Sequence, residues 1–431
     1  MRPAADGEVP GWELPREVPG EAEEGEDVET VKVGIAGLGV IAQVVYLPLL
    51  ARRRDLFRVA AVCDLDREHA ETAGREAGVP AYDDPLAMLD GGGFDALIVL
   101  TPGSHGPLVR AALERGLWVL CEKPVAYSRA ELSGFSGERL MAGYMKQYDP
   151  ASQRLLEALH EAGGPGVVRH LDATVLHPSE ESQLLFARAR TGRPDPRRAA
   201  SFAEADERAL TAALGTSSQR LRRLYAEVLL GSLSHELSLM RLFIGPPDTV
   251  DHVAVWPADA FPPSLEVSGT LGGECPGRYG IRWHHLPSYP AYHEVMTLHH
   301  EHGSLELRFP SPYMLNTPTR LTITCRVGTT ERTILNEDVA EAFERQLRAF
   351  HRFITQEEPP LTGLDGALED IVTAQRIVHR YARWAGIPIG GECAREVTGA
   401  PREATAGADS SYAEEGASGA VSGHAEGSLS R

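Results

Sequence analysis

The chain reads VKVGIAGLGVIAQVVYLPLL over residues 31–50, so that a short apolar strand leads through a glycine-rich turn into an apolar helix. Gly37 permits the tight turn, Gly39 lets the backbone approach a pyrophosphate closely, and Ala42 is small enough for the helix to pack on the strand. This order of strand, turn and helix is typical of a dinucleotide-binding βα unit.

The helix start and the next strand complete the predicted site. Backbone N–H groups around Val40 and Ile41 can face the phosphates, because the first turn of a helix leaves its donors unpaired. A second apolar strand, residues 57–63, ends at Asp64, and a carboxylate there can accept hydrogen bonds from both hydroxyls of an adenosine ribose. We therefore expect Asp64 to favour NAD, with NADP as the alternative if Arg67 binds its 2′-phosphate.

Composition and charge exclude several classes of function. A chain of 431 residues is too long for one ordinary core and suits two domains. Its net charge is -19, and residues 1–30 hold ten acidic and two basic residues, so much of the charge lies at one end. Because the remainder is mildly acidic and has no basic stripe, we expect no binding to nucleic acid. No stretch approaches about 18 uninterrupted apolar residues, and the N-terminal segment lacks a basic region followed by an apolar run, so we expect neither membrane spanning nor secretion.

Cysteine and histidine usage argues against metal and disulfide chemistry. The five cysteines are widely spaced, without a CxxC pair, which favours a reducing cytoplasm over a disulfide framework or a structural zinc site. Several histidines cluster within residues 284–302. Adjacent residues of a strand point to opposite faces, so we interpret these histidines as sheet-surface residues and predict no metal site.

Five segments follow from the distribution of apolar and turn-forming residues. Residues 1–30 and 391–431 are expected to be disordered tails, because they are too poor in large apolar groups to offset the entropy cost of ordering. Alternating strands and helices over residues 31–145 predict an α/β Rossmann domain with a doubly wound parallel sheet. Residues 146–335 predict an α+β domain with a mainly antiparallel sheet, and residues 336–390 predict helices that close the fold.

Several short motifs occur together in one order along the chain. They are the glycine-rich turn, Asp64, Thr101-Pro102, Ser104-His105, Glu122-Lys123-Pro124 and GYMKQYDP at residues 143–150. In this order they resemble the Gfo/Idh/MocA family, which is named after glucose-fructose oxidoreductase, inositol dehydrogenase and a rhizopine catabolism protein. The resemblance covers residues 31–382. It implies an NAD(P)-dependent oxidoreductase that acts on CH–OH groups of sugars, nucleotide sugars or cyclitols.

The resemblance also implies roles for individual residues. Lys123 would stabilise the developing alkoxide, and His235, on a helix expected near residues 217–243, would act as the base. The implied cofactor contacts are Thr101, Pro102, His105, Glu122 and Lys123, and the implied substrate contacts are Lys146, Tyr148 and His177. Packing or capping is the alternative role for His105, interdomain packing is the alternative for Tyr148, and an ordinary loop position is the alternative for His177.

Two glycines depart from the family pattern. The family commonly has Asp four residues before the histidine, where this chain has Gly231, so either Ser232, Tyr148 or Lys146 replaces it or the chemistry is altered. Without that carboxylate nothing obvious raises the pKa of His235, and we expect the pH profile to break near the ordinary histidine value. Gly103 stands where the family often has Asn, which alters the contacts expected around the nicotinamide.

Three functions remain open at this point. The first is a dehydrogenase or reductase of a sugar-like or cyclitol substrate. The second is an enzyme that uses NAD for elimination or glycoside hydrolysis without net redox change, and the third is a non-catalytic dinucleotide sensor. Lys123 and His235 weigh against the third. Members of the family commonly pair through the open face of the second-domain sheet, so we also expect a homo-oligomer.

Overall fold

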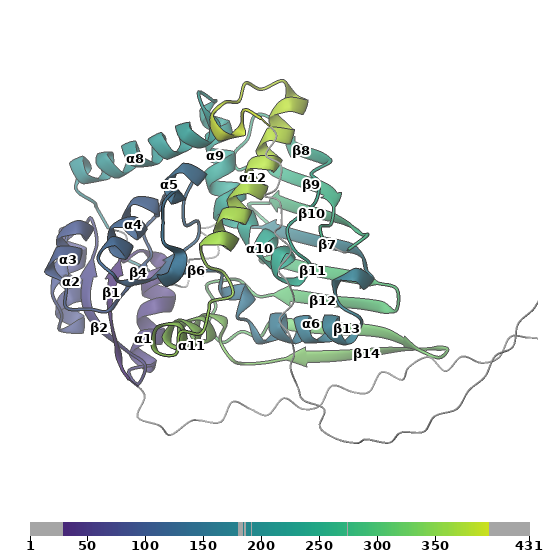
Figure 1. The fold of residues 1–431 in the computed structure, drawn as a ribbon, viewed down its shortest axis with the longest axis horizontal. Coiled ribbons are helices and arrows are strands. Elements are labelled where there is room, and N and C mark those ends of the chain that lie inside the picture. The colour runs from purple at the N-terminus through teal and green to yellow at the C-terminus, as the bar shows by residue number, and fades with distance from the viewer. Residues whose placement is uncertain (1–28, 180–183, 185–186, 191, 274, 396–431) are drawn as a thin grey trace, which may run out of the picture. The chain divides into compact units, whose positions relative to one another are not determined.

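The structure, a computed structural model, describes residues 29–179, 184, 187–190, 192–273 and 275–395. These residues form two β-sheets with helices packed against them (Figure 1). Most of the two predicted tails lies outside the described residues.

The first sheet is parallel and has the strand order β3-β2-β1-β4-β5-β6. Its strands are β1 (Val31–Ala36), β2 (Phe57–Cys63), β3 (Ala81–Tyr82), β4 (Ala96–Val99), β5 (Trp118–Glu122) and β6 (Leu140–Gly143). The strand order reverses between β1 and β4, and ligands of such sheets bind at the carboxyl ends of the strands beside this switch point. The predicted Rossmann sheet is therefore confirmed.

Helices connect these strands and cover the sheet. They are η1 (Ala42–Tyr46), a π-helical turn that continues into α1 (Leu47–Arg52), then α2 (Arg67–Ala77), α3 (Pro85–Gly91), α4 (Gly106–Glu114), α5 (Arg129–Leu132) and η2 (Gly137–Arg139). The start of α2 is capped by Asp66, whose carboxylate accepts the N–H of His69 at 3.1 Å. Gly78 ends α2 with φ at 69°, a left-handed conformation that favours glycine.

The second sheet has the order β14-β13-β12-β11-β7-β10-β9-β8. Its strands are β7 (Val168–His177), β8 (His252–Trp256), β9 (Ser264–Thr270), β10 (Arg278–His285), β11 (His293–His300), β12 (Gly303–Phe309), β13 (Arg320–Val327) and β14 (Thr330–Glu337). Strands β7 and β10 pair in parallel and the other neighbours pair antiparallel, so the expected mainly antiparallel sheet is confirmed.

The helices of the second half pack on this sheet and on the Rossmann sheet. They are η3 (Met145–Gln147), α6 (Pro150–Glu161), η4 (Pro165–Val167), α8 (Pro196–Leu214), α9 (Gln219–Arg223), η5 (Leu224–Leu233), α10 (Ser234–Phe243), α11 (Ala342–Thr355), α12 (Leu364–Ala385) and η6 (Gly391–Cys393). The helix expected near residues 217–243 is present as α9, the π-helical η5 and α10.

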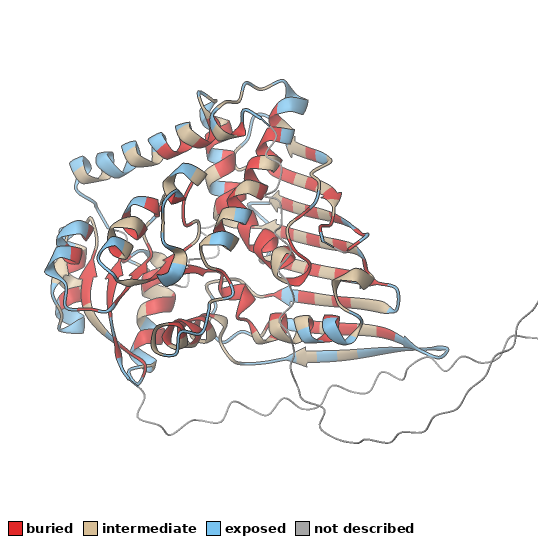
Figure 2. Cartoon of the chain, in the orientation of Figure 1, coloured by how far each residue is buried: buried red, intermediate tan, exposed pale blue. Residues whose placement is uncertain are grey.

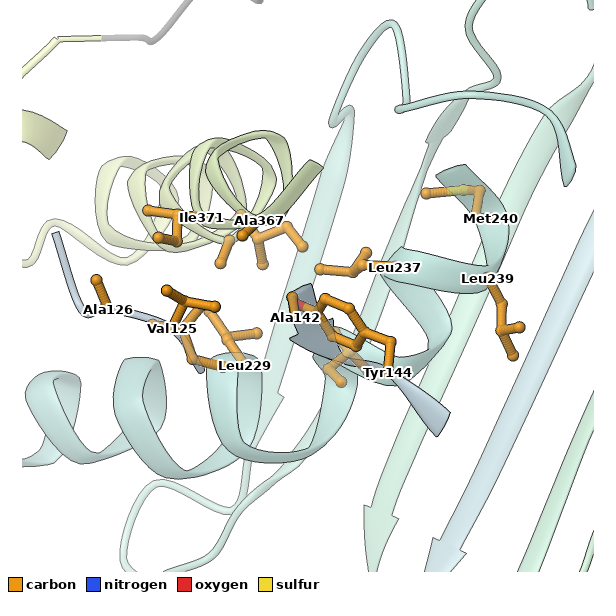
Figure 3. Packing of buried hydrophobic residues seen from close by; sticks show 14 of the residues in the cluster. Val125, Ala126, Ala142, Tyr144, Leu229, Leu237, Leu239, Met240, Ala367 and Ile371 are labelled. Atoms are coloured by element: carbon orange, nitrogen blue, oxygen red, sulfur yellow. The ribbon is translucent and has the colours of Figure 1, made fainter. Parts of the chain in front are cut away.

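One apolar cluster runs from the Rossmann sheet through α10 and α12 to the second sheet, and buried positions occur along most of the strands (Figure 2). In Figure 3, Leu237 of α10 points toward Ala367 of α12, with Tyr144 close by. Each large apolar side chain buried in this way contributes about 1.5 to 3 kcal/mol to folding. The two sheets therefore share a continuous core.

A separate cluster places the late helix α11 against the Rossmann sheet. The rings of Phe57 and Phe350 stack at 6.2 Å, and Trp118 meets Phe353 edge to face at 4.7 Å. The Rossmann sheet is thus completed by a helix from the far end of the chain.

The C-terminal tail begins later than predicted. Glu392 accepts hydrogen bonds from the N–H groups of Arg129 and Ala130 at the start of α5, at 3.0 and 2.8 Å. Cys393 is fully buried, and its carbonyl oxygen lies 2.8 Å from Nδ1 of His379. The boundary at residue 391 is therefore wrong, because these residues cap a helix and fill the core.

All five cysteines are buried with free thiols. Within the described part of the chain, no helix has both the length and the apolar content that crossing a bilayer requires. No set of three His, Cys, Asp or Glu side chains in that same part is placed to hold a metal ion.

Candidate active site

The glycine-rich turn follows β1 as predicted. Gly37 has φ at 94°, and a Cβ there would lie 2.7 Å from main-chain atoms of Leu100 and Thr101. Only glycine meets both conditions, because the conformation is left-handed and the neighbouring backbone cannot move aside. Val40 and Ile41 form the first turn of the helix that follows. Ala42 is fully buried in the apolar cluster beneath the turn.

A cavity of about 250 Å³ opens at this turn. Its Rossmann side includes Gly37, Gly39, Asp64, Thr101 and Pro102. A Cβ on Gly39 would meet no atom within 4 Å, so this glycine leaves open space where the turn faces the cavity. That space suits a close approach between a pyrophosphate and the backbone, and the residues present fit a dinucleotide.

Asp64 is oriented by two main-chain donors at the end of β2. The N–H of Leu38 donates to its Oδ2 and the N–H of Asp66 donates to its Oδ1, each at 2.9 Å. These bonds hold the carboxylate at the edge of the cavity. Arg67 does not line that cavity and instead pairs with Glu71 on α2 at 2.9 Å. The geometry therefore favours ribose hydroxyls over a 2′-phosphate beside Asp64.

His105 joins two loops at the carboxyl ends of β4 and β5. Its Nδ1 lies 2.7 Å from the carbonyl oxygen of Pro124, and its Nε2 lies 2.5 Å from that of Thr101. Burial lowers the pKa of His105. Since both ring nitrogens face main-chain carbonyls, these contacts support the packing alternative, and the contact of His105 with the cofactor remains a prediction.

Glu122 is held inside the protein by two donors. Tyr46 donates to Oε1 at 2.7 Å, and the N–H of Lys123 donates to Oε2 at 3.3 Å. Burial raises the pKa of Glu122. Its carboxyl group thus fixes the turn that presents Lys123, and its contact with the cofactor remains a prediction, as do those of Thr101 and Pro102.

Lys123 reaches across from the end of β5 to the helix that bears His235. Its Nζ donates to the carbonyl oxygen of Gly231 at 2.6 Å. The Lys123–Pro124 peptide bond is cis. Burial is the main cause that lowers the pKa of the Lys123 ammonium, and Lys146 lowers it further, while Glu122 and Glu236 oppose both.

Position 231 carries no carboxylate, and its main-chain carbonyl accepts the hydrogen bond from Lys123. Gly231 lies in the π-helical η5, and a Cβ there would stand 3.1 Å from the carbonyl oxygen of Ala226, closer than ordinary contact. A larger residue would crowd that turn, whereas glycine fits it and offers its own carbonyl to Lys123. The hydroxyl of Ser232, one predicted substitute, accepts the indole N–H of Trp283 at 2.9 Å instead.

His235 is buried on α10 beside two lysines. Its Nδ1 has no hydrogen-bond partner among the described residues, and its ring meets Tyr144 edge to face at 6.4 Å. Burial, followed by repulsion from Lys146 and Lys123, lowers the pKa of His235 well below the ordinary value. The expectation that its pKa is unperturbed is therefore wrong, because the sequence showed the missing acid and not the surrounding cations.

Lys146 lies in a buried group of charges next to His235. Its Nζ is 2.5 Å from both carboxylate oxygens of Glu294 and 3.9 Å from Glu236. Tyr292 donates to Glu294 at 2.5 Å. Burial and the neighbouring Glu294 raise the pKa of Glu236 well above the ordinary value, which favours the protonated form of Glu236.

The two other predicted substrate residues have different surroundings. Tyr148 is buried, and its hydroxyl accepts the N–H of Leu361 at 3.0 Å, which supports the packing alternative. His177 ends β7 and stands 5.4 Å from the ring of Trp283 and 5.8 Å from that of Tyr292. Since Tyr292 bonds to the partner of Lys146, His177 belongs to the rim of the charged group.

The sequence patterns did not predict Glu236, Glu294 and Tyr292 as residues of the candidate site. Glu294 could have been predicted from the sequence, because it lies on the same face of β11 as Met296 and Leu298. A strand buries its apolar residues on that face. A charge on that face indicates a buried partner or a site. Glu236 directly follows His235 and carried no comparable signal.

Chemically, the arrangement brings a buried ammonium and an unprotonated imidazole together at the carboxyl end of a nucleotide-binding sheet. An ammonium with a lowered pKa releases or shares a proton readily, and a neutral imidazole can accept one. These are the groups required to interconvert a hydroxyl and a carbonyl beside a hydride carrier.

Fold and site together define an oxidoreductase-type Rossmann domain, and comparison with known proteins agrees. Residues 31–135 match the model of the oxidoreductase family with an NAD-binding Rossmann fold. This family model is that of Gfo/Idh/MocA, so the match agrees with the resemblance over these residues.

Curated relatives align over part of the chain. An inositol 2-dehydrogenase of Saccharopolyspora erythraea is 36% identical over 146 residues, which cover 32% of this chain and 42% of the relative. A D-xylose 1-dehydrogenase (NADP(+)) of Haloferax volcanii is 34% identical over 133 residues, covering 29% and 39%. The matched stretch spans less than half the length of these relatives.

A solved structure extends the likeness to the whole fold. A UDP-N-acetylglucosamine 3-dehydrogenase from Acidithiobacillus ferrooxidans superposes with a TM-score of 0.59 at 20% identity, covering 82% of this chain and 98% of the other. The two-sheet architecture is therefore shared.

Proposed function

We propose that the protein is an NAD(P)-dependent oxidoreductase that interconverts a hydroxyl and a keto group on a sugar, nucleotide sugar or cyclitol. The observation that carries this proposal is the contact between Lys123 Nζ and the carbonyl of Gly231, one helical turn before His235. It joins a lysine of the Rossmann sheet to the helix of the second half that bears the base. The inositol and xylose dehydrogenase relatives support a polyhydroxylated substrate.

A bound nicotinamide would supply the hydride acceptor or donor. Gly37, Gly39 and Asp64 would hold the dinucleotide at the carboxyl ends of β1 and β2. In the oxidation direction, Nδ1 of His235, which lacks a partner among the described residues, takes the proton of the substrate hydroxyl. Lys123 donates to the same oxygen as negative charge develops on it.

The charged group around Lys146 supports a polar substrate. The side chains of Lys146 and Glu294 are 5% and 2% exposed, so they are ordered before any substrate binds. These charged side chains are already paired and held in place. They can therefore form directional hydrogen bonds to several substrate hydroxyl groups with little rearrangement of the side chains. A free sugar, the sugar part of a nucleotide sugar, or a cyclitol presents such hydroxyls.

The test is a substrate panel followed by the absorbance of reduced nicotinamide. We expect net turnover with at least one sugar, nucleotide sugar or cyclitol, preferring NAD over NADP. Lys123→Ala and His235→Ala should each lose about two or more decades of kcat while the affinity for NAD changes little. Elimination or hydrolysis without net NADH formation would replace this proposal with the non-redox alternative, and NAD binding without any turnover would replace it with the sensor.

We further propose that the protein forms homo-oligomers through the second sheet and works in the reducing cytoplasm. Along β7, His170, Asp172 and Thr174 are partly exposed on the face opposite the buried residues, which leaves that face open to a partner. Arg282 pairs with Asp172 there at 2.7 Å. Sedimentation of the wild type should give a dimer or larger, and Arg282→Glu should weaken it. The free thiols suit a reducing compartment.

A further inference from the structure

A helical arm from the second half of the chain lies against the dinucleotide-binding side of the Rossmann domain. The arm consists of residues 192–195 and α8, which extends toward α4 and α5 in Figure 1. Besides the bond from Arg193 N–H to the carboxylate of Asp66, three hydrogen bonds attach it. They run from Asp195 N–H to the carbonyl of Leu65 at 3.2 Å, from Arg198 to the carbonyl of Asp83 at 2.8 Å, and from Ser104 N–H to Asp206 at 2.9 Å.

The arm also forms one side of the 250 Å³ cavity. Gly192, Pro194 and Phe202 line it opposite Asp64 and Pro102. Phe202 is 39% exposed, while the buried residues of α8 lie farther along, from Ala209 to Leu214. The Phe202 ring is therefore not part of the core. It presents its apolar surface to the cavity.

Gly103, which has no side chain, leaves room for Asp206 of this arm. Gly103 has φ at 86°, and a Cβ there would lie 2.3 Å from Oδ2 of Asp206. A side chain at position 103, such as the Asn common in the family, would displace Asp206 and with it the arm. The departure at Gly103 is thus explained by the docking of α8 and not by a contact with the nicotinamide.

We propose that Phe202 is an adenine-binding residue and that Asp206 positions it. The inference rests on the proposed dinucleotide function and adds to it. Asp64 places the adenosine ribose at the cavity edge, and the purine attached to that ribose then lies between the Rossmann loops and the arm. A flat purine stacks favourably on an aromatic ring, and Phe202 is the aromatic residue among those that line the cavity.

Calorimetric titration of the full chain with NAD and with ADP-ribose tests the proposal. Phe202→Ala should weaken both ligands about tenfold or more and by similar factors, because ADP-ribose keeps the adenosine and lacks the nicotinamide. Phe202→Tyr should restore most of the affinity. Asp206→Ala, which loosens the arm, should weaken both ligands by a smaller factor, and the melting temperatures should stay close to that of the wild type.

Trp384→Ala is the matched control, since this aromatic residue is 69% exposed on α12 and does not line the cavity. We expect the wild type and Trp384→Ala to bind NAD with the same affinity. If Phe202→Ala binds NAD as tightly as these two proteins do, Phe202 does not contact adenine and the inference is overturned. It is also overturned if Phe202→Ala weakens NAD but not ADP-ribose. If the wild type binds neither ligand, the proposed function itself fails.

Discussion

The pKa of His235 sets the expected pH dependence of catalysis. In the proposed reaction the unprotonated imidazole is the base, and burial with Lys146 and Lys123 nearby lowers its pKa well below the ordinary value. The base form is therefore present above the lowered pKa and is lost as the pH falls through it. We expect the acid limb of kcat/KM for alcohol oxidation to break clearly below pH of about 6.5. A break at or above that pH would contradict the assignment of His235 as this base.

The two glycines of the nucleotide turn should respond differently to a methyl group. At Gly37 a Cβ meets main-chain atoms at 2.7 Å with φ at 94°, so Gly37→Ala should lower the melting temperature. At Gly39 a Cβ meets nothing within 4 Å, so Gly39→Ala should melt like the wild type and bind NAD about tenfold or more weakly. Thermal unfolding and NAD titration measure both. Equal melting temperatures for the two variants would refute the steric argument.

Glu236 and Glu294 offer a matched pair of isosteric substitutions. The raised pKa of Glu236 favours its protonated form, so we expect Glu236→Gln to replace one neutral group by another and to change stability little. Glu294→Gln removes the charge that pairs with the buried Lys146 and should lower the free energy of unfolding by about 3 kcal/mol. Denaturant unfolding at neutral pH separates the two. The reverse order of stability would mean that Glu236 carries the charge.

At the scale of elements, the last short helix of the fold should matter for stability. Glu392 caps α5 and Cys393 is buried, so a chain ending at residue 390 loses both. We expect it to be less stable by about 2 to 4 kcal/mol, from a lost cap, lost hydrogen bonds and lost burial. A chain ending at residue 397 keeps these contacts and should melt like the full-length protein. Equal melting of both truncations would show that η6 contributes nothing.

Local patterns predicted the elements that carry the site. The glycine turn, β2 ending at Asp64 and β5 leading to Lys123 each form within a few residues, so composition and spacing were sufficient. The strands β10 and β14 were not predicted, because β14 is largely exposed and β10 begins directly after a glycine-rich loop. The arm was missed for another reason, since its docking depends on Asp206 meeting Ser104, about a hundred residues apart in the chain.

At the scale of the whole molecule, the two halves should unfold together. The apolar cluster crosses from the Rossmann sheet to the second sheet, and Gln147 bonds to both Ser238 on α10 and Thr362 before α12, at 2.9 and 2.7 Å. We expect residues 29–397 to show a single calorimetric transition. A fragment of residues 31–145 should fail to fold alone. Two resolved transitions would show that the predicted limit at residue 145 separates independent domains.

The placement of α11 has a consequence for synthesis on the ribosome. Tyr46 accepts a hydrogen bond from Gln346, 300 residues later, in the same interface where Phe350 covers Phe57. At translation rates of about 5 to 20 residues per second, the nucleotide-binding sheet waits roughly 15 to 60 seconds for the helix that covers it. During that interval the apolar face of the sheet is exposed to chaperones and to other nascent chains. The sheet is therefore protected from aggregation only after α11, near the end of the chain, has been synthesised.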